Sequence, residues 1–238
     1  LFCGAAVGAV GATDFPGPGN VPSGTYTGGN LQSGTYTLQG DVTLETSNLT
    51  VPNGVTCTID LNGHVLKGTG SGSVITVSSG GNLTVIDNTG EYHYFQVQES
   101  GPWQCIDSTA TDAQKAAATP LENITDASQL TRNTFVRVTG GCITGGTVAD
   151  DNGGGVCVNG TLNMNGGNIV GNYVKSQTGG GVYVDSSTFT MSNSAEITGN
   201  CAKRGGGVYV SGGTFTMKKG AIDGNMVQSV NGKMTRGG

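Results

Sequence analysis

A repeat of 26 residues limits the fold of this chain more than any other feature. The motif GGGV begins at Gly153, Gly179 and Gly205, and each copy continues with a Val-x-Val stretch, a stretch that ends in Met, and an Ile. Gly, Ser and Asn separate these stretches, and all three favour turns. Short alternating stretches between turn residues are typical of strands. Each repeat therefore predicts three short strands.

Alternation along these strands assigns their side chains to two faces. Cys157, Tyr183 and Tyr209 are expected to face outward. The expected inward columns are Val156, Val158, Val182, Val184, Val208 and Val210; Leu162, Met164, Phe189, Met191, Phe215 and Met217; and Ile169, Ile197 and Ile222. One repeat cannot bury these residues alone, but stacked repeats form a continuous core. We therefore expect an all-β fold, a parallel β-helix (β-solenoid) with three strands and about 26 residues per coil, in about seven or eight coils.

An asparagine follows glycine at the same turn of each repeat. These residues are Asn172, Asn200 and Asn225. Stacked in register, their amides are expected to form a structural ladder of hydrogen bonds from coil to coil. The 44 glycines among 238 residues fit the same fold, because tight corners that recur in every coil require positive φ.

Four segments are expected along the chain. Residues 1–24 form an N-terminal arm, in which Leu1 to Ala12 is either the remnant of a secretory leader or a packed apolar arm, followed by a Pro/Gly-rich linker. Residues 25–87 form the N-terminal coils, residues 88–133 an insertion, and residues 134–238 the C-terminal coils. The last boundary rests on Phe135 to Ile143, which repeats the spacing from Phe189 to Ile197.

The segments SGTYTLQGDVTLETSNLTVPNGVTCTIDLNGHVLKGTG (33–70) and GGGVYV, TFTM and ITGN resemble the right-handed parallel β-helix of pectin-lyase-like proteins. More narrowly, they resemble the Gly-rich repeats of bacterial and archaeal adhesin-like cell-surface proteins. This resemblance implies a secreted or cell-surface location and a structural or adhesive role that presents a surface to glycan or protein. The alternative is a polysaccharide lyase or glycoside hydrolase of the same fold.

The insertion holds an aromatic cluster that is the candidate binding site. Its members are Tyr92, His93, Tyr94, Phe95 and Trp103. Exposed aromatic rings would stack on sugars or fill pockets of a partner. Alternatively, the rings pin the insertion against the side of the solenoid. Asp112 and the alanines after it predict one short helix.

Charge and cysteine content narrow the partners. The net charge of −5, with 11% charged residues, leaves no basic footprint for nucleic acid. No apolar run is long enough to span a membrane. The six cysteines have no zinc-like spacing, so we expect neither metal nor other cofactor. They fit disulfides or buried thiols equally well.

Catalytic residues are not predicted. Asp150 and Asp151 form the only adjacent acidic pair, but they precede a GGG turn and are expected to be a solvated corner, and His64 is expected to be a surface turn residue. The chain ends in MTRGG, which matches the KRGG that opens the last repeat. Either the chain is a fragment of a longer solenoid, or its open last coil is covered by another molecule, in which case copies are expected to stack end to end into a filament.

Overall fold

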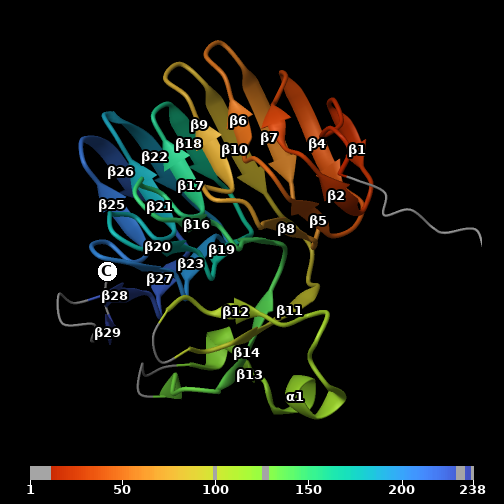
Figure 1. Ribbon diagram of the computed structural model, residues 1–238, viewed down its shortest axis with the longest axis vertical. Helices are drawn as coiled ribbons and strands as arrows, with labels where there is room; N and C mark the ends of the chain where they lie inside the picture. The colour runs from red at the N-terminus through yellow and green to blue at the C-terminus, as the bar shows by residue number, and fades with distance from the viewer. Residues whose placement is uncertain (1–11, 99–100, 125–128, 229–233, 237–238) are drawn as a thin grey trace, which may run out of the picture.

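The computed structural model describes residues 12–98, 101–124, 129–228 and 234–236. The chain forms a right-handed parallel β-helix with a smaller inserted subdomain on one side (Figure 1). The predicted fold class is confirmed. The proposed leader remnant at Leu1 to Ala12 lies almost wholly outside the described residues.

Three parallel sheets form the walls of the solenoid. Sheet 1 contains β1 (Gly19–Val21), β4 (Gly34–Leu38), β7 (Thr56–Asp60), β10 (Asn82–Ile86), β18 (Thr161–Met164), β22 (Ser187–Met191) and β26 (Gly213–Met217). Sheet 2 contains β2 (Gly24–Tyr26), β5 (Val42–Leu44), β8 (Val65–Gly68), β15 (Cys142–Thr144), β19 (Asn168–Val170), β23 (Glu196–Thr198) and β27 (Ala221–Asp223). Sheet 3 contains β3 (Gly29–Asn30), β6 (Leu49–Val51), β9 (Ile75–Val77), β17 (Val156–Val158), β21 (Val182–Val184) and β25 (Val208–Val210).

Like residues stack in register inside the solenoid, as the repeat predicts. Leu162 pairs with Phe189, which pairs in turn with Phe215, and the last two rings stack with centroids 4.8 Å apart. The inward side chains of the middle coils are fully buried. In the last described coil the same columns open to solvent, and Met217 is 45% exposed.

The later coils have a fourth strand that the sequence pattern did not predict. Sheet 4 contains β16 (Thr147–Val148), β20 (Tyr173–Val174), β24 (Cys201–Ala202), β28 (Met226–Gln228) and β29 (Met234–Arg236). Its parallel strands are mostly two residues long and lie after the glycine-containing turns that end sheet 2. A stretch of two residues is too short to show alternation, and only the small buried cluster of Val148, Val174 and Ala202 marks it.

The asparagine ladder runs through the corner between sheets 2 and 4. Asn172 Nδ2 donates to Asn200 Oδ1 at 3.0 Å and to the Ile143 carbonyl at 3.1 Å. Asn200 Nδ2 donates in the same way to Asn225 Oδ1 at 3.0 Å and to the Ile169 carbonyl at 2.9 Å. The three side chains are buried, so these bonds satisfy both their own polar atoms and the corner carbonyls.

Both ends of the solenoid differ from expectation. The predicted arm already contains β1, which pairs with β4, because a strand of three residues with one apolar side chain gives no alternating pattern. Phe15 packs on Tyr26 and Tyr36 at this end. At the other end, β29 pairs antiparallel with β28, so Met234–Arg236 closes a hairpin instead of opening a parallel coil.

The insertion forms sheet 5, made of β12 (Gln104–Cys105), β11 (Tyr92–Gln96), β14 (Phe135–Thr139) and β13 (Thr119–Pro120), with α1 (Asp112–Ala117) and a 3₁₀ turn (Leu121–Asn123). The short helix is confirmed, and its N-cap is Thr111. The predicted boundary after 133 is wrong, because β14 pairs antiparallel with β11. Phe135 therefore belongs to the insertion, whereas Ile143 pairs with Ile169 in sheet 2.

Asp87 joins the two ends of the insertion. Its carboxylate accepts hydrogen bonds from the backbone of Gly63 at 2.7 Å and of Gly141 at 3.1 Å. Thr89 donates to the same carboxylate at 3.1 Å. Gly141 lies directly before β15, where the chain re-enters the solenoid. The chain thus leaves and returns at one corner, and Asp87 is 5% exposed there.

Candidate functional site: a crevice between sheet 2 and the insertion

The insertion packs on the outer face of sheet 2 through an apolar contact. Val65, Cys142 and Val170 project from the sheet and contact a buried cluster of the insertion that includes Phe95 and Trp103. Trp103 also donates its backbone N–H to the Gly199 carbonyl at 2.9 Å. These contacts hold the insertion at a fixed position, so the surfaces beside the contact have a defined shape.

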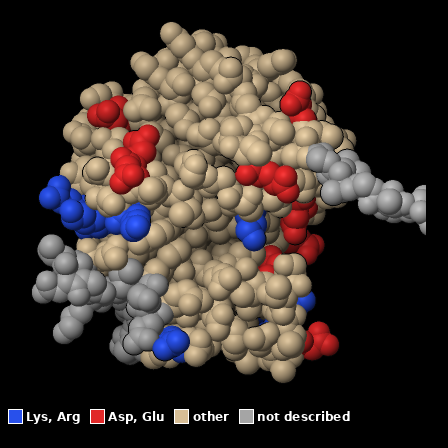
Figure 2. Space-filling model, viewed as in Figure 1, with Lys and Arg blue, Asp and Glu red and all other residues tan. Residues whose placement is uncertain are grey.

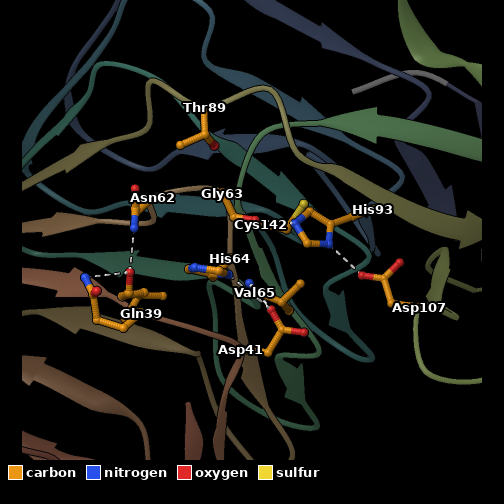
Figure 3. Close-up of polar contacts among 12 residues, drawn as sticks. Gln39, Asp41, Asn62, Gly63, His64, Val65, Thr89, His93, Asp107 and Cys142 are labelled. Atoms are coloured by element: carbon orange, nitrogen blue, oxygen red, sulfur yellow. Dashed lines mark hydrogen bonds and ion pairs between the residues drawn. The ribbon is translucent and has the colours of Figure 1, made fainter. Parts of the chain in front are cut away.

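His93, which is buried, and Asp107, which is partly buried, form a clasp at one end of this contact (Figure 3). His93 Nδ1 lies 2.6 Å from Asp107 Oδ2, and Nε2 lies 2.8 Å from the Gly63 carbonyl oxygen. The second carboxylate oxygen of Asp107 accepts the backbone N–H of Tyr94. Both ring nitrogens therefore face acceptors, which is the arrangement of a doubly protonated imidazole.

The pKa of His93 is raised above its ordinary value. Burial would lower the pKa, but the hydrogen bond and charge of Asp107, the Gly63 carbonyl and the charge of Asp41 outweigh it. Because both nitrogens are engaged, His93 has no free atom for a substrate. The clasp joins the insertion to the solenoid.

A crevice of two adjoining hollows runs beside the clasp, between sheet 2 and the insertion. The larger has a volume of about 410 Å³ and is lined by Lys67, Gln98, Pro102, Trp103, Gln104, Cys105, Thr144, Gly145 and Gly171. The smaller has a volume of about 250 Å³ and is lined by Asp41, Val42, Thr43, Val65, Lys67, Cys105, Asp107 and Ser108. Lys67 and Cys105 line both hollows. We call these two hollows together the crevice.

Charged side chains are sparse over the face of the molecule in Figure 2. The few charged groups of the crevice are therefore the main candidates for binding a charged ligand there. Of the described residues that line the larger hollow, Lys67 is the only charged one, and among the described residues its side chain makes neither an ion pair nor a hydrogen bond. The smaller hollow adds Asp41 and Asp107. The crevice therefore offers one ammonium group flanked on one side by two carboxylates.

The structure separates the members of the predicted aromatic cluster. Phe95 and Trp103 are 0% and 2% exposed, so they anchor the insertion and cannot stack on a ligand in this arrangement. His93 is buried in the clasp. Tyr92 is 49% exposed and packs on Arg137 at 4.2 Å, and Tyr94 is half-buried with Lys115 at 5.7 Å from its ring. Phe95, Trp103 and His93 therefore hold the insertion against the side of the solenoid, and the crevice lies beside them.

The other residues considered for catalysis are turn residues. His64 is partly exposed, with Nδ1 3.9 Å from Asp41 Oδ1, and Asp150 and Asp151 are exposed at their corner. Sequence reasoning missed Asp41, Lys67 and Asp107, which lie far apart in the chain. Only the register that pairs Thr43 with Lys67 and Lys67 with Thr144 brings the floor of the crevice together.

Four cysteines of the described chain are free thiols: Cys57, Cys105, Cys142 and Cys157. Burial raises the pKa of Cys105 to about 11, with further contributions from Asp107 and neighbouring groups. Such a thiol stays protonated near neutral pH and is a poor nucleophile. Within the described residues, no group of three or more His, Cys, Asp and Glu side chains is placed to hold a metal ion.

Searches of protein-family models, curated proteins and solved structures found no match to this chain. In the described part of the chain, no helix is long and apolar enough to cross a membrane. The fold and the crevice define the class of molecule: a parallel β-helix with one inserted subdomain and a crevice of mixed polar and apolar lining at the junction.

Proposed function

We propose that this protein is an extracellular β-solenoid that binds an acidic glycan in the crevice and otherwise acts as a rigid support. The resemblance to adhesin-like and pectin-lyase-like proteins supports the extracellular location. The observation that supports an acidic ligand is the position of Lys67, whose ammonium group has no partner in the described structure and lines both hollows.

The lining fits an acidic sugar followed by a neighbouring sugar. A sugar carboxylate in the larger hollow would pair with Lys67, while Gln98, Gln104 and Thr144 supply hydrogen bonds to hydroxyl groups. In the smaller hollow, Asp41 and Asp107 would accept hydrogen bonds from hydroxyl groups of the next sugar. Amide side chains suit sugar hydroxyls because they both donate and accept, and carboxylates suit them because both oxygens accept.

A glycan array with uronic-acid and neutral polymers tests this proposal, using the wild type beside Lys67→Ala and the matched surface control Lys175→Ala. We expect binding of uronic-acid polymers that is lost in Lys67→Ala, retained in Lys175→Ala, and weakened by salt. Binding that survives in Lys67→Ala would contradict the proposal.

A uronide lyase is the second candidate, because one hollow holds two carboxylates and a Lys base. In that reaction the base removes the proton from C5 of the uronate, a C4=C5 double bond forms as the C4–O bond breaks, and the departing sugar oxygen takes up a proton from water. The same polymers are therefore incubated with the protein and followed at 235 nm for the unsaturated product. A product that disappears in Lys67→Ala would replace the binding proposal with this one.

A further inference from the structure

A second cleft lies on the outer face of sheet 3, away from the crevice. Its volume is about 410 Å³, and its lining includes Asn48, Thr76, Asp151, Cys157, Tyr183 and Asp185. Ligand pockets are commonly about 300–1,000 Å³, so this cleft is large enough for a small ligand or one to two rings of a polymer. We call it the tyrosine cleft.

The tyrosine cleft forms where the outward column of sheet 3 changes in size. Thr76 pairs with Cys157, and Cys157 pairs with Tyr183. The short side chains of Thr76 and Cys157 form the floor of the cleft, and the ring of Tyr183 forms a wall beside it. The glycine and serines at 71–73 line the same floor, which keeps it open.

One face of the Tyr183 ring is already covered. Tyr209 lies in the next coil and stacks on Tyr183 with centroids 6.0 Å apart and planes 10° apart. Tyr183 lines the cleft, and Tyr209 does not. The face of Tyr183 opposite Tyr209 therefore borders the cleft, and Tyr209 holds the ring in place. A fixed flat ring is suited to stacking because little conformational entropy is lost on binding.

The polar groups of the cleft are carboxylates, amides and hydroxyls. Asp151 and Asp185 come from successive coils, and Asn48 donates to Thr76 Oγ1 at 2.7 Å. Asp151, Asp185 and Cys157 line the cleft together. Burial raises the pKa of Cys157 to about 11, and the charges of Asp151 and Asp185 add to the shift. Of the described residues that line the cleft, none is Lys, Arg or His.

We propose that the tyrosine cleft binds a neutral sugar ring, stacked on Tyr183 and held by hydroxyl hydrogen bonds to Asp151 and Asp185. The two carboxylates disfavour anionic ligands, because like charges repel and, unlike in the crevice, no described Lys, Arg or His side chain in the lining offsets them. Stacking and hydroxyl acceptors favour an uncharged polyhydroxylated ring. The tyrosine cleft thus selects a ligand of different charge from that of the crevice.

The test measures binding of neutral oligosaccharides by isothermal titration calorimetry, with hexose- and pentose-based chains as probes and oligogalacturonate as the anionic probe. Tyr183→Ala is expected to weaken binding of the neutral probe about 2- to 12-fold, as the loss of one aromatic stacking contact predicts. Tyr183→Phe keeps the ring and is expected to bind like the wild type. Asp185→Asn reports on the hydroxyl contacts and is expected to weaken binding.

The controls separate this site from the rest of the molecule. Tyr92→Ala removes an exposed tyrosine of the insertion and Lys67→Ala removes the cation of the crevice, so both are expected to bind the neutral probe normally. Circular dichroism and the thermal midpoint show whether each variant is folded. Absence of neutral-probe binding at millimolar concentration in the wild type overturns the proposal, as does equal binding by a folded Tyr183→Ala or loss with Lys67→Ala.

Discussion

Trp103 lies over Gly199. The backbone N–H of Trp103 donates to the Gly199 carbonyl at 2.9 Å, and a Cβ on Gly199 would fall inside the contact distance of the indole ring. Gly199 also has φ +61. The glycine that precedes an asparagine of the ladder therefore has a second role, because it makes room for the residue that anchors the insertion.

Replacing Gly199 by Ala is expected to displace Trp103 and loosen the insertion. Trp103 is the only tryptophan in the chain, so a red shift of its emission and greater quenching by acrylamide measure the change. Gly54→Ala is the matched control, because Gly54 has φ +77 and nothing within 4 Å of an added Cβ. An equal change in both variants would show that backbone strain alone is responsible.

Trp103→Ala is expected to lower the free energy of unfolding by about 3–5 kcal/mol, since it removes a large buried side chain. Urea unfolding measures this loss. Because Trp103 contacts the insertion and sheet 2 together, the loss should first appear as rapid hydrogen exchange in sheet 5 while the solenoid stays protected. Uniform loss of protection throughout the chain would contradict this.

Asn200→Ala is expected to destabilise the solenoid by about 1–3 kcal/mol for each buried group left unpaired. The substitution removes the acceptor of Asn172 Nδ2 and the donor to the Ile169 carbonyl. Thermal unfolding compares it with Asn163→Ala, an outward asparagine of β18 that takes no part in the ladder. Equal midpoints for the two variants would show that the ladder adds no stability.

Rising pH is expected to weaken the His93 clasp. Its folded pKa is raised, so its stabilising contribution is fully present below the unfolded pKa of about 6.5 and is lost as the pH passes the folded pKa. Urea unfolding of the wild type and His93→Gln, from about pH 5 to about pH 9, should show a difference that shrinks with pH. A difference that grows with pH contradicts the assignment.

Glu196 predicts a second effect of the same sign. Burial raises its pKa to about 7, with further contributions from Asp223 and Glu122. The folded protein therefore loses stability as the pH rises from the ordinary pKa of a glutamate, 4.5, to about 7. Glu196→Gln should be more stable than the wild type above this pH, by about 1–2 kcal/mol after allowance for partial solvent exposure. A less stable Glu196→Gln at high pH would count against this.

The solenoid could be predicted because the pattern that encodes it is periodic. Val156, Phe189 and Ile197 belong to columns that recur in register, and their spacing alone identifies each column. The same reasoning failed at Phe135, where a spacing of eight residues agrees with the repeat by chance, while five paired residues place the strand beside β11. A single match of spacing between two residues is too little information to place a segment in a coil of the solenoid.

The candidate sites were harder to predict for a different reason. Lys67, Asp107 and Tyr183 acquire their roles from neighbours in other coils or in the insertion, and no local motif marks these contacts. Aromatic content drew attention to residues 92–103, but composition does not distinguish an anchoring ring from a binding ring. Burial of Trp103 and Phe95 made that distinction.

The corner at Asp87 makes the inserted segment an exchangeable part. Because the chain departs and returns where one carboxylate spans Gly63 and Gly141, a graft of different length leaves the register of the coils unchanged. Loop-closure entropy grows only slowly with length, so long grafts are tolerated. A replacement segment must present an apolar surface that packs on Val65, Cys142 and Val170. With that one requirement, the solenoid can serve as a scaffold for unrelated inserted segments.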